Sequence, residues 1–128
     1  MDFANDLREW SVADVINVPT GTYFSSALGE DVGLYRFISA TGCLIDGAGE
    51  TTTLTIQGTN DEDRIGANWA TVYGYDSINH LWVNQMTITN GTLVYAWDFD
   101  YWNYKFMRAL ITTTAATNTV IIKARGRT

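Results

Sequence analysis

Residues 53–73 read Thr-Leu-Thr-Ile-Gln-Gly-Thr-Asn-Asp-Glu-Asp-Arg-Ile-Gly-Ala-Asn-Trp-Ala-Thr-Val-Tyr, and this stretch decides the fold class. Leu54 and Ile56 alternate with polar residues, which is typical of a β-strand with one covered face. The strand ends at Gly58, and the Thr-Asn-Asp run that follows carries the side chains that form turns. A second strand-like run opens on Trp69. The stretch therefore predicts a β-sheet, and nothing comparable in the chain predicts catalysis.

Strand-like runs continue through the rest of the chain, separated by turn residues at fairly regular intervals. We predict strands over 22–27, 34–41, 52–58, 69–74, 81–89, 92–97, 104–114 and 118–125. Such spacing is typical of a sandwich or a barrel, and no helical segments separate the runs. We therefore expect one all-β domain over 1–128, an antiparallel β-sandwich of about eight strands.

Three local patterns refine this fold. Asn90-Gly91 predicts a hairpin, because both central residues of a type I′ turn need positive φ. Residues 104–114 are largely apolar on both faces, which indicates a central strand or a strand covered by another chain. Residues 118–125 separate an apolar face from a mixed one, which indicates that one face is buried.

The N-terminal residues 1–19 differ from the body at 20–128. Phe3, Leu7 and Trp10 fall at spacings of four and three, which is helical. One interpretation is a short amphipathic turn packed on the body. The other is an arm that lies on a neighbouring subunit and binds it through these three side chains.

Length and composition exclude several classes of protein. The 128 residues, 46% of them hydrophobic, suffice for one buried core. No apolar run approaches the roughly 20 residues of a membrane-spanning helix, and the acidic start is unlike a secretory signal. We expect cytoplasmic synthesis and no membrane partner.

Charge is distributed unevenly along the chain. The net charge of −6 disfavours nucleic-acid binding, which needs a basic face. All fourteen acidic residues lie in 1–100, whereas the last 28 residues hold five basic residues and no acid. The basic tail Lys123, Arg125 and Arg127 either binds an acidic patch of a neighbouring subunit or neutralises acids of its own chain.

The residues that could bind metals or act as nucleophiles are few. Cys43 is the only cysteine, and we expect a buried, inert thiol; a nucleophile with His80 as its base is the alternative. One cysteine and one histidine cannot form a zinc site. The acidic run 60–63 lacks the spacing of an EF-hand, and no glycine-rich phosphate loop precedes a helix. We expect no cofactor and no bound metal.

The densest chemical cluster is Trp-Asp-Phe-Asp-Tyr-Trp at 97–102. In a strand, the aromatic rings and the carboxylates of Asp98 and Asp100 would be displayed together. The predicted partner-binding aromatics are Trp97, Phe99, Tyr101 and Trp102. Such a face suits a protein interface or a glycan, whereas ordinary core packing is the third interpretation. A glycosidase dyad of the two aspartates lacks any context that would raise a pKa, so we expect no enzyme.

Two motifs resemble known families. The strand, Asn-Asp turn and tryptophan of 54–69 resemble an element of discoidin-like jelly rolls. The arginine-containing strand at 104–111 and the basic-Gly-basic end at 125–127 are similar to small β-sandwich proteins of tailed-phage virions. The strand at 35–42 fits the same pattern, but the acidic loop 61–66 and the aromatic concentration at 75–103 depart from it.

The resemblance implies a jelly-roll-like sandwich and a structural role in a virion, synthesised in the host cytoplasm. It implies a capsid decoration or cement protein, a homo-oligomer that binds the major capsid protein or another virion protein. A tail or head-fibre component is one alternative. A carbohydrate-binding module that recognises a surface glycan is the other.

Overall fold

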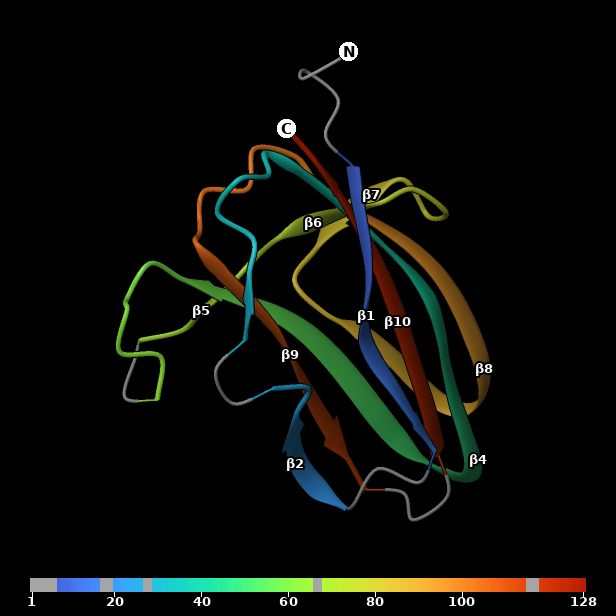
Figure 1. Ribbon diagram of the computed structural model, residues 1–128. Coiled ribbons are helices and arrows are strands. Elements are labelled where there is room, and N and C mark those ends of the chain that lie inside the picture. Colours follow the sequence, from blue (N-terminus) through green and yellow to red (C-terminus); the bar gives the residue numbers. More distant parts are fainter. Residues whose placement is uncertain (1–6, 17–19, 27–28, 66–67, 115–117) are drawn as a thin grey trace.

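The computed structural model describes residues 7–16, 20–26, 29–65, 68–114 and 118–128, and every regular element in these ranges is a β-strand (Figure 1). The strands are β1 Leu7–Ile16, β2 Gly21–Phe24, β3 Glu30–Asp31, β4 Phe37–Thr59, β5 Ala70–Thr71, β6 Gly74–Asp76, β7 Leu81–Val83, β8 Met86–Phe99, β9 Phe106–Thr113 and β10 Asn118–Arg127. All pairings are antiparallel, so the predicted all-β antiparallel class is confirmed. The described part of the chain contains no helix long and apolar enough to cross a membrane.

The sheet curls because β4 and β8 are long, bent strands. The first half of β4 pairs with β10 and β8, and its second half pairs with β9 and β8. Figure 1 shows β4 running down one side, turning, and returning along the other. The order is β1-β10-β4-β8-β6-β7, and β9 pairs with β4 on one side and with β2 and β3 on the other. The described residues form one curled sheet of ten strands, so the expected sandwich and its number of about eight strands are not confirmed.

The core lies inside this curl. Leu54 and Ile56, whose alternation predicts the strand, are completely buried on β4. Strand β9 is paired on both sides, which confirms that its two apolar faces mark a central strand. On β10, Val120, Ile122 and Ala124 are buried, whereas Ile121 and Lys123 between them are not, so the single buried face is also confirmed.

Asn90-Gly91 does not close a hairpin. Strand β8 continues across these residues and pairs with β4 on both sides of them. Asn90 has a φ of 55° and Gly91 a φ of 132°, opposite a register shift in β4 between Asp46 and Thr51. The predicted positive φ angles are present, but they bend one strand instead of joining two. The hairpin prediction was wrong because the same backbone angles serve both purposes.

Gly91→Val is expected to lower the free energy of unfolding by about 1–2 kcal/mol, because a branched residue is strained at positive φ. A Cβ at Gly91 would meet no atom within 4 Å, so backbone strain is the expected main cost. Urea unfolding followed by circular dichroism measures it. The control is Thr92→Val on the exposed neighbouring residue, which should change stability by less than about 0.5 kcal/mol. Equal losses in the two variants would contradict a strained bend.

Candidate functional site

The aromatic run 97–102 forms core rather than surface. Trp97 and Phe99 are completely buried and Trp102 nearly so, whereas Tyr101 is 68% exposed. The ring centroids of Trp97 and Phe99 lie 5.0 Å apart, and those of Phe99 and Trp102 lie 5.7 Å apart. The prediction of a shared interface or glycan face was therefore wrong for Trp97, Phe99 and Trp102. Only Tyr101 is displayed.

The reason is that β8 ends at Phe99, before the run is complete. Tyr101 takes a φ of 58° in the turn that follows, and Trp102 then points into the body. The backbone N–H of Trp102 donates to the carbonyl of Arg36 at 2.6 Å. Its indole Nε1–H donates to the carbonyl of Tyr104 at 2.7 Å. Asp98 lies in β8 and Asp100 lies beyond its end, so the two carboxylates are not spaced as they would be in one continuous strand.

The helical interpretation of the N-terminal segment was wrong for Leu7 and Trp10. Leu7 and Trp10 belong to strand β1, which pairs with β10, and Phe3 lies outside the described residues. Trp10 is half-buried and stacks on Tyr35 at a centroid distance of 6.0 Å, whereas Leu7 is exposed. Pairing with β10 overrides the helical spacing of these side chains. Strand β1 therefore lies on its own body.

The basic tail contacts acids of its own chain. Lys123 lies 3.8 Å from Asp14, and Arg125 lies 3.8 Å from Glu9. The guanidinium of Arg127 lies 4.7 Å from the ring centroid of Phe37. The β1–β10 pairing places these charges side by side, which favours the interpretation of neutralisation within the chain. These side chains remain exposed, so binding of a partner stays a prediction.

The other candidate residues are dispersed. Cys43 is half-buried on β4, and His80 lies in the turn between β6 and β7 with its Nδ1 3.5 Å from the Tyr75 hydroxyl. In the acidic run 60–63, the carbonyl oxygen of the Asn60 side chain accepts the N–H of Lys105 at 2.8 Å. Among the described residues, no group of three His, Cys, Asp or Glu side chains is placed to hold a metal ion.

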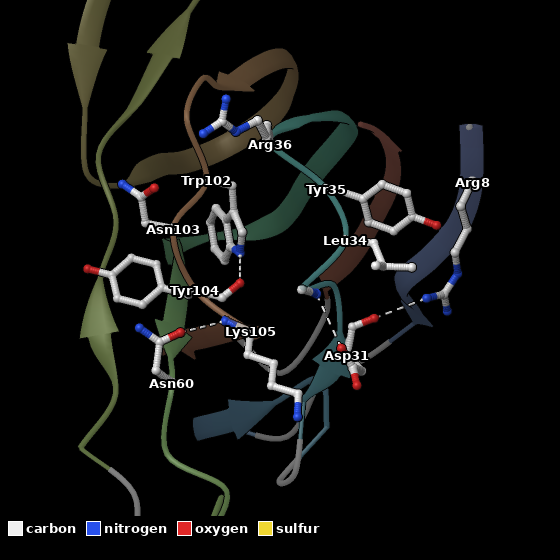
Figure 2. Close-up of a pocket in the computed structure, with 11 residues that line it drawn as sticks. Arg8, Asp31, Leu34, Tyr35, Arg36, Asn60, Trp102, Asn103, Tyr104 and Lys105 are labelled. Atoms are coloured by element: carbon white, nitrogen blue, oxygen red, sulfur yellow. Dashed lines mark hydrogen bonds between the residues drawn. The ribbon is translucent and has the colours of Figure 1, made fainter. Parts of the chain in front are cut away.

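The structure brings together a hollow that the sequence does not suggest. This loop hollow has a volume of about 690 Å³ and lies between the β3–β4 loop and the β8–β9 loop (Figure 2). Its lining residues are Arg8, Asp31, Gly33, Leu34, Tyr35, Arg36, Asn60, Trp102, Asn103, Tyr104 and Lys105. Two backbone hydrogen bonds brace the loops: Trp102 N–H to the Arg36 carbonyl, and Val32 N–H to the Lys105 carbonyl at 2.7 Å. The hollow is therefore held in shape by the fold.

Three cationic side chains line the loop hollow, and two of them are paired with carboxylates. Arg8 forms an ion pair with Glu30 at 3.0 Å and donates to the carbonyl of Asp31. Lys105 forms an ion pair with Glu62, and this carboxylate raises the pKa of Lys105. Arg36 is exposed at one end of the hollow. Sequence reasoning missed the site because its two loops are about 70 residues apart and pattern analysis is local.

A second exposed feature is apolar. We call it the hairpin patch: the exposed side chains of Ile78, Leu81 and Trp82 on the β6–β7 hairpin and of Val94 on β8. Leu81 and Trp82 are consecutive on β7, so they point to opposite faces of that strand. Trp82 is 57% exposed, and its ring meets Tyr75 edge-on at 5.5 Å. Leu81 and Val94 line the same shallow hollow of about 420 Å³. Trp82 falls within the predicted strand 81–89, and the sequence pattern gave no sign that its side chain is exposed.

The carboxylate of Asp76 holds the turn of this hairpin. One oxygen accepts the N–H groups of Ile78 at 3.0 Å and Asn79 at 3.1 Å, and the other accepts the Asn79 side-chain amide at 2.8 Å. Burial alone would raise the pKa of Asp76. The hydrogen bonds from Asn79 and Ile78, with the nearby His80, together lower this pKa below its usual value.

Asp76→Asn is expected to remove a pH-dependent part of the stability. Because the pKa is lower in the folded state, the ionised carboxylate stabilises the fold above the ordinary value of 3.8. That contribution is lost as the pH falls through the folded value. The Tm difference between wild type and variant should therefore be constant above about pH 5 and shrink below about pH 4. Asn79→Ala removes one donor and should give an intermediate profile; a difference that grows towards acid would contradict this account.

Comparison with solved structures adds a fold relationship. The crystal structure of the SPBc2 prophage-derived protein YomS matches with a TM-score of 0.66 and 13% identity, covering 100% of this chain and 98% of that chain. The PBSX exported protein XepA matches with a TM-score of 0.69 and 11% identity, and this chain spans 40% of its length. The chain shares the fold of two phage-derived proteins. At these identities the likeness is one of fold.

No family model and no curated protein matches the chain. A Clostridium thermocellum xylanase structure with CBM22 and GH10 modules matches with a TM-score of 0.44 at 11% identity, over 98% of this chain and 27% of that chain, which is too low to support carbohydrate binding. The discoidin-like and jelly-roll parts of the resemblance therefore stay predictions. Trp69, which carried that resemblance, has a packing role: the Arg108 guanidinium lies 4.1 Å from its ring centroid and 4.1 Å from that of Phe24.

Proposed function

We propose that the chain is a structural protein of a phage particle, a non-catalytic accessory protein of the capsid decoration type. The observation that carries the proposal is the whole-length fold likeness to YomS, a prophage-derived protein. The XepA likeness supports the same phage association. In this role the chain binds the major capsid protein or another virion protein and forms homo-oligomers. A tail or head-fibre position is the alternative within the same class.

The hairpin patch is the surface that we assign to these contacts. Exposed tryptophans are frequent in interface hot spots, and the exposed aliphatic side chains of the patch lie on the same hairpin and on β8. Ile78, Leu81 and Val94 are each about half exposed or more, so a partner would remove them from water. Many copies on one particle would add their affinities through multivalency. This surface replaces the buried aromatics of 97–102 in the proposed mechanism.

Particle association tests the function directly. Particles purified from the phage or lysogen that encodes the chain are expected to contain it in many copies, as measured by quantitative mass spectrometry after gradient banding. The chain should stay with the particle band in physiological salt. A chain found only in the soluble fraction would contradict a structural role, whatever its oligomeric state.

Trp82→Ser is expected to weaken self-association at least tenfold, because hot-spot tryptophans typically contribute about 2 kcal/mol or more. Sedimentation velocity of the purified chain across a concentration series measures the change. Tyr73→Ser, which removes another exposed aromatic ring outside the patch, is the matched control and should associate like wild type. Monomeric wild-type protein at all concentrations would contradict the homo-oligomer, and equal weakening in both variants would contradict the assigned surface.

A further inference from the structure

We propose that the loop hollow binds a carboxylate-bearing sugar, such as a uronic or sialic acid unit of a surface polysaccharide. The inference goes beyond the assembly role and does not depend on it, since the hollow and the hairpin patch share no residue. Its volume of about 690 Å³ lies within the roughly 300–1,000 Å³ of small-ligand sites. The two loops that form it are hydrogen-bonded to each other, so the site is largely preformed.

The carboxylate of such a sugar would bind Arg36. Of the three cationic side chains at the hollow, Arg8 and Lys105 already form ion pairs with Glu30 and Glu62. Within the described ranges, the Arg36 side chain forms neither an ion pair nor a hydrogen bond, and Figure 2 shows it at one end of the hollow. A guanidinium binds a carboxylate through two parallel hydrogen bonds, which are stronger than those between neutral groups.

The hollow offers hydrogen-bond acceptors and donors to the hydroxyl groups of the sugar. The Asp31 carboxylate, which accepts the N–H of Gly33 at 3.2 Å, has capacity to accept a hydroxyl proton. Asn103 is exposed on the opposite side, and its amide both donates and accepts. A sugar hydroxyl also donates and accepts, so different hydroxyls of the sugar can bind the two groups.

The apolar lining favours a sugar over a peptide. Leu34 is 78% exposed and lies with Tyr35 on one side of the hollow, facing Trp102 across it (Figure 2). The C–H faces of a sugar ring can pack on Leu34 and Tyr35. Extended peptides are usually held by an open strand edge or a long groove. Here braced loops border the site, which suits a compact ring.

An NMR titration of the ¹⁵N-labelled full chain tests the proposal. The probes are galacturonic acid trisaccharide, α2,8-linked sialic acid trisaccharide and neutral maltotriose. We expect at least one acidic probe to shift the amide signals of Gly33, Leu34 and Asn103, with a Kd at least tenfold lower than that of maltotriose. Arg36→Gln should raise this Kd by about tenfold or more. The Arg36 backbone is unchanged in this variant, so the bracing bond to Trp102 remains.

Arg125→Gln is the matched control, because Arg125 is an exposed arginine outside the loop hollow. It should bind the acidic probe like wild type. Equal weakening by Arg36→Gln and Arg125→Gln would show non-specific attraction of anions and overturn the proposal. The proposal would also be overturned if neither acidic sugar, at about 10 mM, shifted the amide signals of Gly33, Leu34 and Asn103. Tighter binding of a triglutamate peptide than of either sugar would assign the site to a protein ligand instead.

Discussion

Trp97→Ala is expected to lower the free energy of unfolding by about 3–5 kcal/mol, the usual cost of truncating a buried tryptophan. Trp97 has no exposed surface, and its ring packs against Phe99 at 5.0 Å. The indole also fills the space above Gly74, where a Cβ would overlap it. Such a loss is a large part of the roughly 5–15 kcal/mol of a typical domain. Urea unfolding followed by far-ultraviolet circular dichroism measures it.

The matched control is Trp82→Ala, which removes the same side chain from a position that is 57% exposed. It should cost less than about 1 kcal/mol when measured at a protein concentration where the chain is monomeric. If Trp97→Ala and Trp82→Ala were equally destabilising, the burial of the 97–102 run would be contradicted. In that case the predicted aromatic binding face would return as an interpretation.

Gly42→Ala is expected to cost about 3 kcal/mol, at the upper end for an overpacked core. Gly42 lies on β4 between β10 and β8, where an added Cβ would overlap the backbone carbonyl of Ile121. The same carbonyl accepts a hydrogen bond of 2.6 Å from the buried Tyr95 hydroxyl. The Gly42 backbone and the Ile121 carbonyl belong to paired strands, so neither can move without displacing its strand. Chemical denaturation and amide exchange of β10 measure the loss.

Gly33→Ala is the control for this substitution. A Cβ there would lie 3.2 Å from the Cγ atom of Lys105, which belongs to a flexible side chain and can move aside. Its cost should stay below about 1 kcal/mol. A Gly42→Ala protein as stable as Gly33→Ala would show that β4 and β10 are not paired in the described register.

Local alternation predicts the strands well wherever one face is buried. Alternate residues of β4 and β10 are buried, as the period of two predicts: Leu54, Ile56, Val120, Ile122 and Ala124. The sequence could not show that 34–41 and 52–58 belong to one strand, β4. A bend within a strand and a turn between strands use the same small and polar residues, and only the pairing partner distinguishes them. Such merging lowers the strand count, whereas β1, β3 and β6 raise it, so the described count is ten and the expected eight is not confirmed.

The candidate site was harder to predict than the fold. Burial of Trp102 depends on its hydrogen bonds to Arg36 and Tyr104, and one of these partners is 66 positions away. Arg36 itself becomes notable only because Arg8 and Lys105 are already paired. Such relations arise from strand order, which composition and spacing do not determine. Chemical clusters were therefore predicted where residues are adjacent in sequence, and the hollow was missed.

The pairing of β1 with β10 has a consequence for synthesis. Leu7 lies opposite Arg127, so the first described strand has no partner until the last one has been made. A nascent chain would therefore keep β1 unpaired while the ribosome completes the remaining strands. Because such distant contacts are slow to form, folding is expected on the millisecond-to-second scale typical of all-β domains. During that interval chaperones would have access to the exposed apolar side of β1.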